Sequence, residues 1–226
     1  MIKKHIPNFI TSLNLFSGCI AVYLAFQGNY QGAFIAILLS AVFDFFDGFA
    51  ARLLKAYSPM GKELDSLADV VSFGVAPGAI VFSLLSEINI SAWLPYLAFL
   101  IPVFSALRLA KFNIDERQSA SFIGLPTPAN AIFWAGLGFS YSNFLVSNVW
   151  ILVALTLLFS YLLVAEIPMF ALKFKSLTWS KNKIQYLFLI GCAFILVLFQ
   201  LKAFAMLIAW YILLSIGIMI FDKSNR

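Results

Sequence analysis

Apolar residues follow one another along this chain in eight long segments that are separated by short polar breaks. A transmembrane helix needs about 20 predominantly apolar residues, and most of the segments come close to that length. The pattern therefore predicts an all-α fold, a polytopic membrane bundle of about eight transmembrane helices. The segment 184–199 is short, so a six-span topology with two re-entrant or interfacial segments is the alternative. The segments cover roughly 9–26, 32–54, 63–85, 92–110, 128–145, 149–171, 184–199 and 203–221.

Composition supports a membrane protein and argues against a soluble domain. Of the 226 residues, 62% are hydrophobic and only 11% are charged, so a soluble fold of this length could not bury its apolar side chains. We expect a single integral membrane domain over residues 1–226, with additional C-terminal spans at about 149–221. The first apolar run continues past Cys19 to Phe26, which predicts a retained helix rather than a cleaved signal.

The basic residues lie almost entirely in alternate connections between the apolar segments. When the amino terminus is placed in the cytoplasm, all of the 15 Lys and Arg residues except Lys202 fall on the cytoplasmic side. This positive-inside bias predicts an integral protein of a bacterial inner membrane with both termini cytoplasmic. The bias also accounts for the net charge of +5, so we expect no nucleic acid partner.

Four aspartates interrupt the apolar pattern where the second and third segments meet a short cytoplasmic connection. Asp44 and Asp47 are three residues apart and Asp65 and Asp69 are four apart, so each pair shares one helix face. Two antiparallel helices joined by the loop 55–62 bring those faces together. Close carboxylates repel one another at low dielectric, and they either take up protons or bind cations. Oxygen ligands without His or Cys favour Mg²⁺, Mn²⁺ or Ca²⁺, and the number of carboxylates suits two ions.

Small and basic residues beside the aspartates leave room for a phosphate-bearing ligand. Gly48 and Ala51 lie on the side of Asp44, and Gly61 permits a close backbone approach before the third span. Arg52 points toward the same end and suits a diphosphate. Two alternatives remain at this point: Gly48 would also serve close helix packing, and Arg52 would also extend to the membrane surface.

These residues together resemble the signature of a known enzyme family. The spacing Asp44-x2-Asp47-Gly48-x2-Ala51-Arg52-x8-Gly61-x3-Asp65-x3-Asp69 is similar to that of the CDP-alcohol phosphatidyltransferases. The resemblance implies that Asp44, Asp47 and Asp65 hold two divalent ions, and that Asp69 is both a metal ligand and the catalytic base. It also implies that Gly48, Arg52 and Gly61 border the CDP portion of a lipid substrate. Homodimers are usual in this family, so we expect one here.

The first apolar segment carries a polar stripe of its own. Asn8, Thr11 and Asn14 recur every three residues on an otherwise apolar helix. The family places a similar stripe beside the nucleotide, so the resemblance implies that Asn8 and Thr11 contact the CDP-lipid. Asn8 alone would also serve as an interfacial helix cap.

The connection between the fourth and fifth segments carries the signal for the acceptor alcohol. The stretch SALRLAKFNIDERQSASFIGLPTPANA, residues 105–131, resembles the branch of the family that uses serine, as do IPNFITSLNLFSG and FGVAPG. The resemblance covers residues 1–135. Lys111 stands where this branch usually has Arg, which keeps the charge but loses a bidentate fork. Alternatively, the connection is a basic loop that faces anionic lipid. The polar groups expected to bind serine are those of Arg108, Lys111, Asn113 and Thr127.

The resemblance therefore implies metal-dependent transfer of a phosphatidyl group from CDP-diacylglycerol to L-serine, giving phosphatidylserine and CMP. The same chemistry with glycerol 3-phosphate or an inositol acceptor, or with an archaeal ether-lipid donor, is one alternative. A transporter whose membrane aspartates line an ion path is another. An ion path should carry polar residues to the other membrane face, whereas these aspartates gather at one face.

Overall fold

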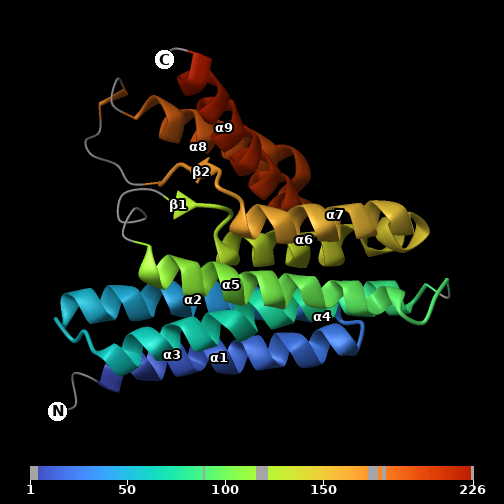
Figure 1. The fold of residues 1–226 in the computed structure, drawn as a ribbon, viewed down its shortest axis with the longest axis horizontal. Helices are drawn as coiled ribbons and strands as arrows, with labels where there is room; N and C mark the ends of the chain where they lie inside the picture. Colours follow the sequence, from blue (N-terminus) through green and yellow to red (C-terminus); the bar gives the residue numbers. More distant parts are fainter. Residues whose placement is uncertain (1–4, 89, 116–121, 173–177, 180–181, 225–226) are drawn as a thin grey trace.

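The computed structural model describes residues 5–88, 90–115, 122–172, 178–179 and 182–224, and they form a helical bundle (Figure 1). Two rods are composite, because α3, the π-helix η2 and α4 run on without a break, as do the 3₁₀-helix η3 and α5. The described residues thus contain eight helical rods, one for each predicted segment. The elements are α1 (His5–Phe26), α2 (Tyr30–Leu53), α3 (Pro59–Asp69), η2 (Val70–Val75), α4 (Ala76–Ser86), η3 (Leu94–Phe99), α5 (Leu100–Ile114), β1 (Phe122–Ile123), α6 (Thr127–Ser147), α7 (Val149–Val164), β2 (Pro168–Met169), α8 (Lys183–Phe199), η6 (Gln200–Ala203) and α9 (Phe204–Ser224).

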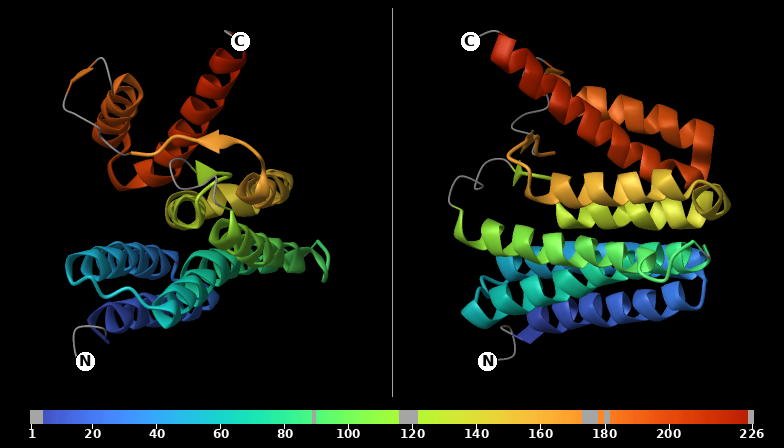
Figure 2. Two further views of the ribbon diagram at one scale, coloured as in Figure 1. Left: turned by 60° about the vertical axis from the view of Figure 1, so that its left-hand side comes forward. Right: turned by 45° about the vertical axis from the view of Figure 1, so that its right-hand side comes forward.

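The rods are stacked in layers, as Figures 1 and 2 show. Helices α1 to α5 form the lower part of the bundle, α6 and α7 lie on top of it, and the α8–α9 hairpin slants away above them. The start of α1 and the end of α9 lie towards the same end of the bundle, where α2 is also connected to α3 (Figure 1). The core lies where α4, η2, α5 and α6 meet, and Phe73, Ile80, Ile101 and Trp134 are fully buried there.

The perimeter of the bundle is apolar, as a bilayer requires. Large side chains such as Phe9, Phe16 and Tyr23 are exposed along α1, and α8 buries none of its residues. Among the described residues, five helical stretches are long and apolar enough to cross a membrane; one of them, Lys183–Phe221, contains α8 and most of α9. The all-α polytopic membrane fold is therefore confirmed, and the protein is an integral membrane protein. The number of crossings and the single-domain organisation stay predictions.

The predicted segment 149–171 is too long at its carboxyl end. Helix α7 ends at Val164, and the chain then forms β2, which pairs antiparallel with β1 through Phe122 opposite Met169. Pro168 explains the break, because proline lacks an amide donor and disfavours helical geometry at the preceding residue. This short two-stranded ribbon was not part of the sequence prediction.

Local capping positions the hairpin that carries the aspartates. The Ser58 hydroxyl accepts a hydrogen bond from the Gly61 amide at 3.0 Å, and Pro59 stands in the first turn of α3. Both α2 and α3 pack chiefly against α1 rather than against each other. This arrangement leaves room between α2 and α3 for side chains and a ligand.

Candidate active site

The four aspartates from α2 and α3 come together at one end of the bundle. Ligand oxygens of Asp44, Asp47 and Asp65 all lie within 4.8 Å of one another. Asp44 is also within hydrogen-bonding reach of Asp69, the last residue of α3, about three helical turns from the start of that helix. Asp47 and Asp69 are buried, whereas Asp44 and Asp65 are partly exposed. We call these four residues the carboxylate cluster.

The donor set of the carboxylate cluster fits a divalent cation. Asp44, Asp47 and Asp65 supply only oxygen ligands, which hard ions such as Mg²⁺ and Mn²⁺ prefer. The Oδ2 atom of Asp47 is buried and has no hydrogen-bond partner among the residues that the structure describes. A buried carboxylate oxygen without a donor is costly unless a cation approaches it. The residues present therefore fit a metal site.

Asn14 of α1 holds the deepest carboxylate in place. Its Nδ2 donates to Asp69 Oδ1 at 3.2 Å, and its own backbone carbonyl accepts from the hydroxyls of Ser40 and Ser72 at 3.1 and 3.0 Å. Three elements, α1, α2 and η2, are thus tied together at one residue. Asn14 belongs to the polar stripe seen in the sequence, but our site prediction included only Asn8 and Thr11. The periodicity of the stripe was the signal that would have added it.

The helix widens into the π-helix η2 directly after Asp69. A Cβ atom on Gly18 would lie 2.2 Å from the Ser72 hydroxyl oxygen, so glycine lets α1 approach η2 closely. π-Helical turns are rare and occur frequently at functional sites. Here the turn brings Ser72 onto the Asn14 carbonyl and so supports the position of Asp69 indirectly.

An open pocket of about 230 Å³ lies beside the carboxylate cluster. Its lining comes from α1, α2, α3 and the α2–α3 connection. Four residues that we predicted to border the CDP-lipid line it, and so do two of the aspartates. Lys62 also lines it, a cation that the sequence prediction left out. The residues are Pro7, Asn8, Thr11, Asp47, Gly48, Ala51, Ala56, Tyr57, Ser58, Gly61, Lys62 and Asp65.

The two predicted glycines have different surroundings in this pocket. A Cβ on Gly61 would lie 3.0 Å from both Asn8 Oδ1 and Ser58 Oγ, so a side chain there would crowd the pocket wall. A Cβ on Gly48 would meet no atom within 4 Å, so Gly48 opens space rather than packing against a helix. Arg52 is exposed and is not part of the lining, because its Nε donates to the Gly48 carbonyl at 3.0 Å.

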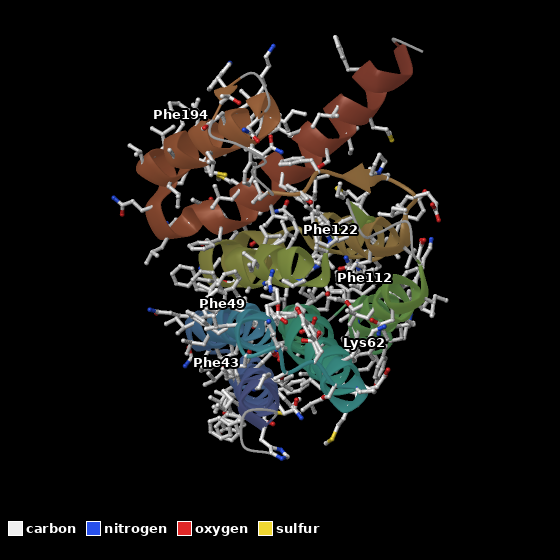
Figure 3. All side chains as sticks on the ribbon, turned by 90° about the vertical axis from the view of Figure 1, so that its left-hand side faces the viewer. Phe43, Phe49, Lys62, Phe112, Phe122 and Phe194 are labelled. Atoms are coloured by element: carbon white, nitrogen blue, oxygen red, sulfur yellow. The ribbon has the colours of Figure 1, made fainter. Side chains whose placement is uncertain are left out.

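Two of the predicted acceptor residues are buried and carry polar atoms that have no hydrogen-bond partner among the described residues. Arg108 is only 5% exposed, and its Nε and Nη2 atoms have no hydrogen-bond acceptor in that part of the chain. Its guanidinium lies 5.1 and 5.9 Å from the ring centres of Phe112 and Phe122, which Figure 3 shows close together near the end of α5. Arg108 also interacts electrostatically with Asp69. Thr127 is fully buried, and no described residue forms a hydrogen bond with its hydroxyl.

The other two predicted acceptor residues are bound to protein groups instead. Lys111 forms an ion pair with Glu166, which follows α7. The side-chain Nδ2 of Asn113 donates to the Ser66 hydroxyl at 2.8 Å, and the backbone carbonyl of Asn113 accepts from Lys62 Nζ at 3.3 Å. Lys111 and Asn113 thus link α5 to the α7 end and to α3. A role in serine binding stays a prediction for both.

Comparison with known proteins agrees with the geometry. The family model described as CDP-alcohol phosphatidyltransferase matches residues 4–162. The CDP-diacylglycerol–serine O-phosphatidyltransferase of Bacillus subtilis (strain 168) is 38% identical over 148 residues, covering 64% of this chain and 81% of that protein. The protein of the same name from Methanocaldococcus jannaschii is 34% identical over 163 residues, covering 72% of each chain. That of Mycobacterium leprae (strain TN) is 34% identical over 174 residues, covering 73% of this chain and 57% of that protein.

The match spans every element of the carboxylate cluster and the pocket beside it, and ends two residues before the end of α7. It therefore includes all the predicted site residues and leaves out the α8–α9 hairpin. Because the matched family consists of enzymes, the match argues against the transporter alternative. The chain belongs to the CDP-alcohol phosphatidyltransferase family.

Proposed function

We propose that this protein transfers the phosphatidyl group of CDP-diacylglycerol to the hydroxyl of L-serine, giving phosphatidylserine and CMP. The observation that carries the proposal is the convergence of Asp44, Asp47 and Asp65 within 4.8 Å beside an open pocket. The printed names of the related proteins support CDP-diacylglycerol as the donor and serine as the acceptor.

The carboxylate cluster would hold two divalent ions, Mg²⁺ or Mn²⁺, with Ca²⁺ as a further candidate. When bound, such ions neutralise a diphosphate and make CMP a better leaving group. Asp44, Asp47 and Asp65 would be the principal metal ligands. Asp69 would be a further ligand that also acts on the hydroxyl group of the acceptor. The pocket residues Asn8, Thr11, Gly48 and Gly61 would border the CDP portion. Arg52 would stand near the phosphates at the end of α2.

Asp69 would act as the general base. Its Oδ1 atom accepts from Asn14, which leaves the second carboxylate oxygen to take the proton of the serine hydroxyl. The serine oxygen would then form a bond to the phosphorus that carries diacylglycerol, while the bond from that phosphorus to the CMP oxygen breaks. The proton ends on Asp69, and CMP leaves as the phosphate anion. Arg108 and Thr127 would bind the acceptor, with Lys111 and Asn113 nearer the surface.

We also propose that the protein lies in the inner membrane of a bacterium, with both termini cytoplasmic, and that it forms a homodimer. The distribution of Lys and Arg supports this orientation. The start of α1 and the end of α9 lie towards the same end of the bundle, which agrees with this orientation (Figure 1). We propose the homodimer because homodimers are usual in this family.

The test is an acceptor panel with purified protein in lipid nanodiscs. CDP-diacylglycerol is supplied with Mn²⁺, and L-serine, glycerol 3-phosphate and inositol are offered in parallel while CMP release is followed. We expect CMP release with serine, and phosphatidylserine as the lipid product. Release with another acceptor alone would overturn serine as the substrate. Repeating the serine reaction with an archaeal ether-lipid donor tests the lipid class, and faster CMP release with that donor would overturn CDP-diacylglycerol.

A further inference from the structure

Four buried polar side chains, two from α5 and two from α6, carry atoms that have no hydrogen-bond partner in the described part of the chain. Native proteins pair nearly all buried polar groups, so such a concentration calls for a missing partner. Ser105 and Arg108 come from one face of α5, and Thr127 and Asn130 come from one face of α6. None is more than 5% exposed. We call Ser105, Arg108, Thr127 and Asn130 the α5–α6 polar cluster; their unpartnered atoms are Ser105 Oγ, Arg108 Nε and Nη2, Thr127 Oγ1, and both Asn130 amide atoms.

The α5–α6 polar cluster lies around η2, the element that follows Asp69. Helix α5 packs against η2, and a Cβ on Gly74 of η2 would lie 3.1 Å from the Ser105 Cβ. Helix α6 packs against η2 as well. Asp69 joins the two regions, since it is within reach of Asp44 and interacts electrostatically with Arg108. None of these four residues lines the pocket beside the aspartates. The α5–α6 polar cluster is therefore a separate polar region that is connected to Asp69 through Arg108.

We propose that Asn130 determines acceptor specificity by binding a small zwitterionic amino alcohol together with Arg108 and Thr127, an inference that rests on the proposed function. The two unpartnered N–H groups of Arg108 match a carboxylate. The Asn130 carbonyl oxygen accepts from the ammonium group, and its NH₂ group and the Thr127 hydroxyl donate to the carboxylate.

The neutral amide is what makes the cluster selective. Serine offers both an ammonium donor and a carboxylate acceptor, so it satisfies Asn130 and Arg108 at once. Glycerol 3-phosphate and inositol carry no cationic donor, and the buried Asn130 oxygen then stays unpaired. A site built to hydrogen-bond a substrate group rejects analogues that lack it, because its own polar atoms are left unsatisfied. The rings of Phe112 and Phe122 beside Arg108 exclude water and strengthen these contacts.

The test replaces the polar atoms and keeps the volume, in Asn130→Leu and Thr127→Val. The KM for serine should rise about tenfold to hundredfold in Asn130→Leu, as expected for a lost hydrogen bond to a charged group. The KM for CDP-diacylglycerol should stay unchanged. The Tm of the substrate-free protein should stay equal or rise, because each change removes a buried group that has no partner. A purely structural role predicts a lower Tm instead.

An analogue comparison isolates the contact to the ammonium group. The ratio of kcat/KM for serine to that for 3-hydroxypropanoate, which lacks the ammonium, should fall in Asn130→Leu. The matched control is Asn148→Leu just beyond the other end of α6, where the amide donates to the Phe144 carbonyl at 2.9 Å. This control should keep the wild-type serine KM and the wild-type ratio.

The outcomes separate this inference from the proposed function. If wild-type protein makes phosphatidylserine and Asn130→Leu shows an unchanged serine KM and ratio, Asn130 has no role in acceptor binding and the inference is wrong. A lower Tm in both Asn130→Leu and Asn130→Ala would show that the Asn130 side chain stabilises the fold, and this result would also overturn the inference. If wild-type protein releases CMP only with an acceptor without an ammonium group, the proposed function and the ammonium contact both fail.

Discussion

The carboxylate cluster and the α5–α6 polar cluster lie at the same end of the bundle, but they are held in different ways. At the first, Asn14 binds Asp69, and serines from α2 and η2 bind the Asn14 carbonyl. At the second, Arg108, Thr127 and Asn130 are buried, and several of their polar atoms have no hydrogen-bond partner within the described ranges. The first region is built into the fold and needs only cations. The second is complete only when an acceptor is present.

Removal of metal should have the largest effect, because it acts on the cluster that the fold has already assembled. A chelator should abolish turnover, since close carboxylates without cations repel one another and cannot bind a diphosphate. Added Mn²⁺ or Mg²⁺ should restore it. CMP release before and after chelation is the measurement, and full activity in a metal-free sample would contradict the metal assignment.

The substitution Asp69→Asn should have the second-largest effect on turnover. The amide fills the same space but does not accept a proton, so kcat should fall about a hundredfold to ten-thousandfold, the usual contribution of a general base. Binding of CDP-diacylglycerol should remain in part. The control is Glu87→Gln at the other end of the bundle, where Glu87 accepts from the Tyr30 hydroxyl. Equal losses of kcat in Asp69→Asn and Glu87→Gln, or normal turnover in Asp69→Asn, would show that Asp69 is not the general base.

Arg108→Ala tests the second region and should act mainly on the acceptor. The KM for serine should rise about tenfold or more, as for other charge-assisted hydrogen bonds, with a much smaller change in the KM for CDP-diacylglycerol. Both constants come from CMP release with one substrate varied at a time. The reverse pattern would place Arg108 at the lipid.

Lys111→Met should have the smallest effect of the series. Its partner is Glu166 and both side chains are substantially exposed, so the pair is screened by water and contributes little to stability. We expect a change in serine KM of about twofold or less, which the same kinetic assay measures. A rise as large as that of Arg108→Ala would show that Lys111 leaves Glu166 and binds serine, as the sequence resemblance implies.

The two regions also differ in how much of their structure could be predicted from the sequence. Asp44, Asp47, Asp65 and Asp69 were predictable because short spacings on two joined helices bring side chains together whatever the rest of the fold does. The helices themselves followed from apolar runs of membrane length. Prediction therefore succeeded where neighbours in the sequence are also neighbours in space.

Other features depend on segments that are far apart in the chain. Lys111 and Glu166 are 55 residues apart, as are Asn14 and Asp69, and no local pattern predicts either contact. Asn130 belongs to the stretch 105–131 that resembles the serine branch, but nothing local singled it out; its burial and its lack of a partner among the described residues did. The end of α7 was marked by Pro168, but the apolar run around it concealed the signal.

Binding of Mn²⁺, followed by the electron paramagnetic resonance signal of the free ion, tests the metal site between α2 and α3 without requiring turnover. We expect wild-type protein to bind two Mn²⁺ ions per chain, and Asp44→Asn and Asp65→Asn each to weaken this binding strongly. Glu87→Gln should bind as wild type does. Equal Mn²⁺ binding by wild type and both aspartate variants would contradict a metal site shared between α2 and α3.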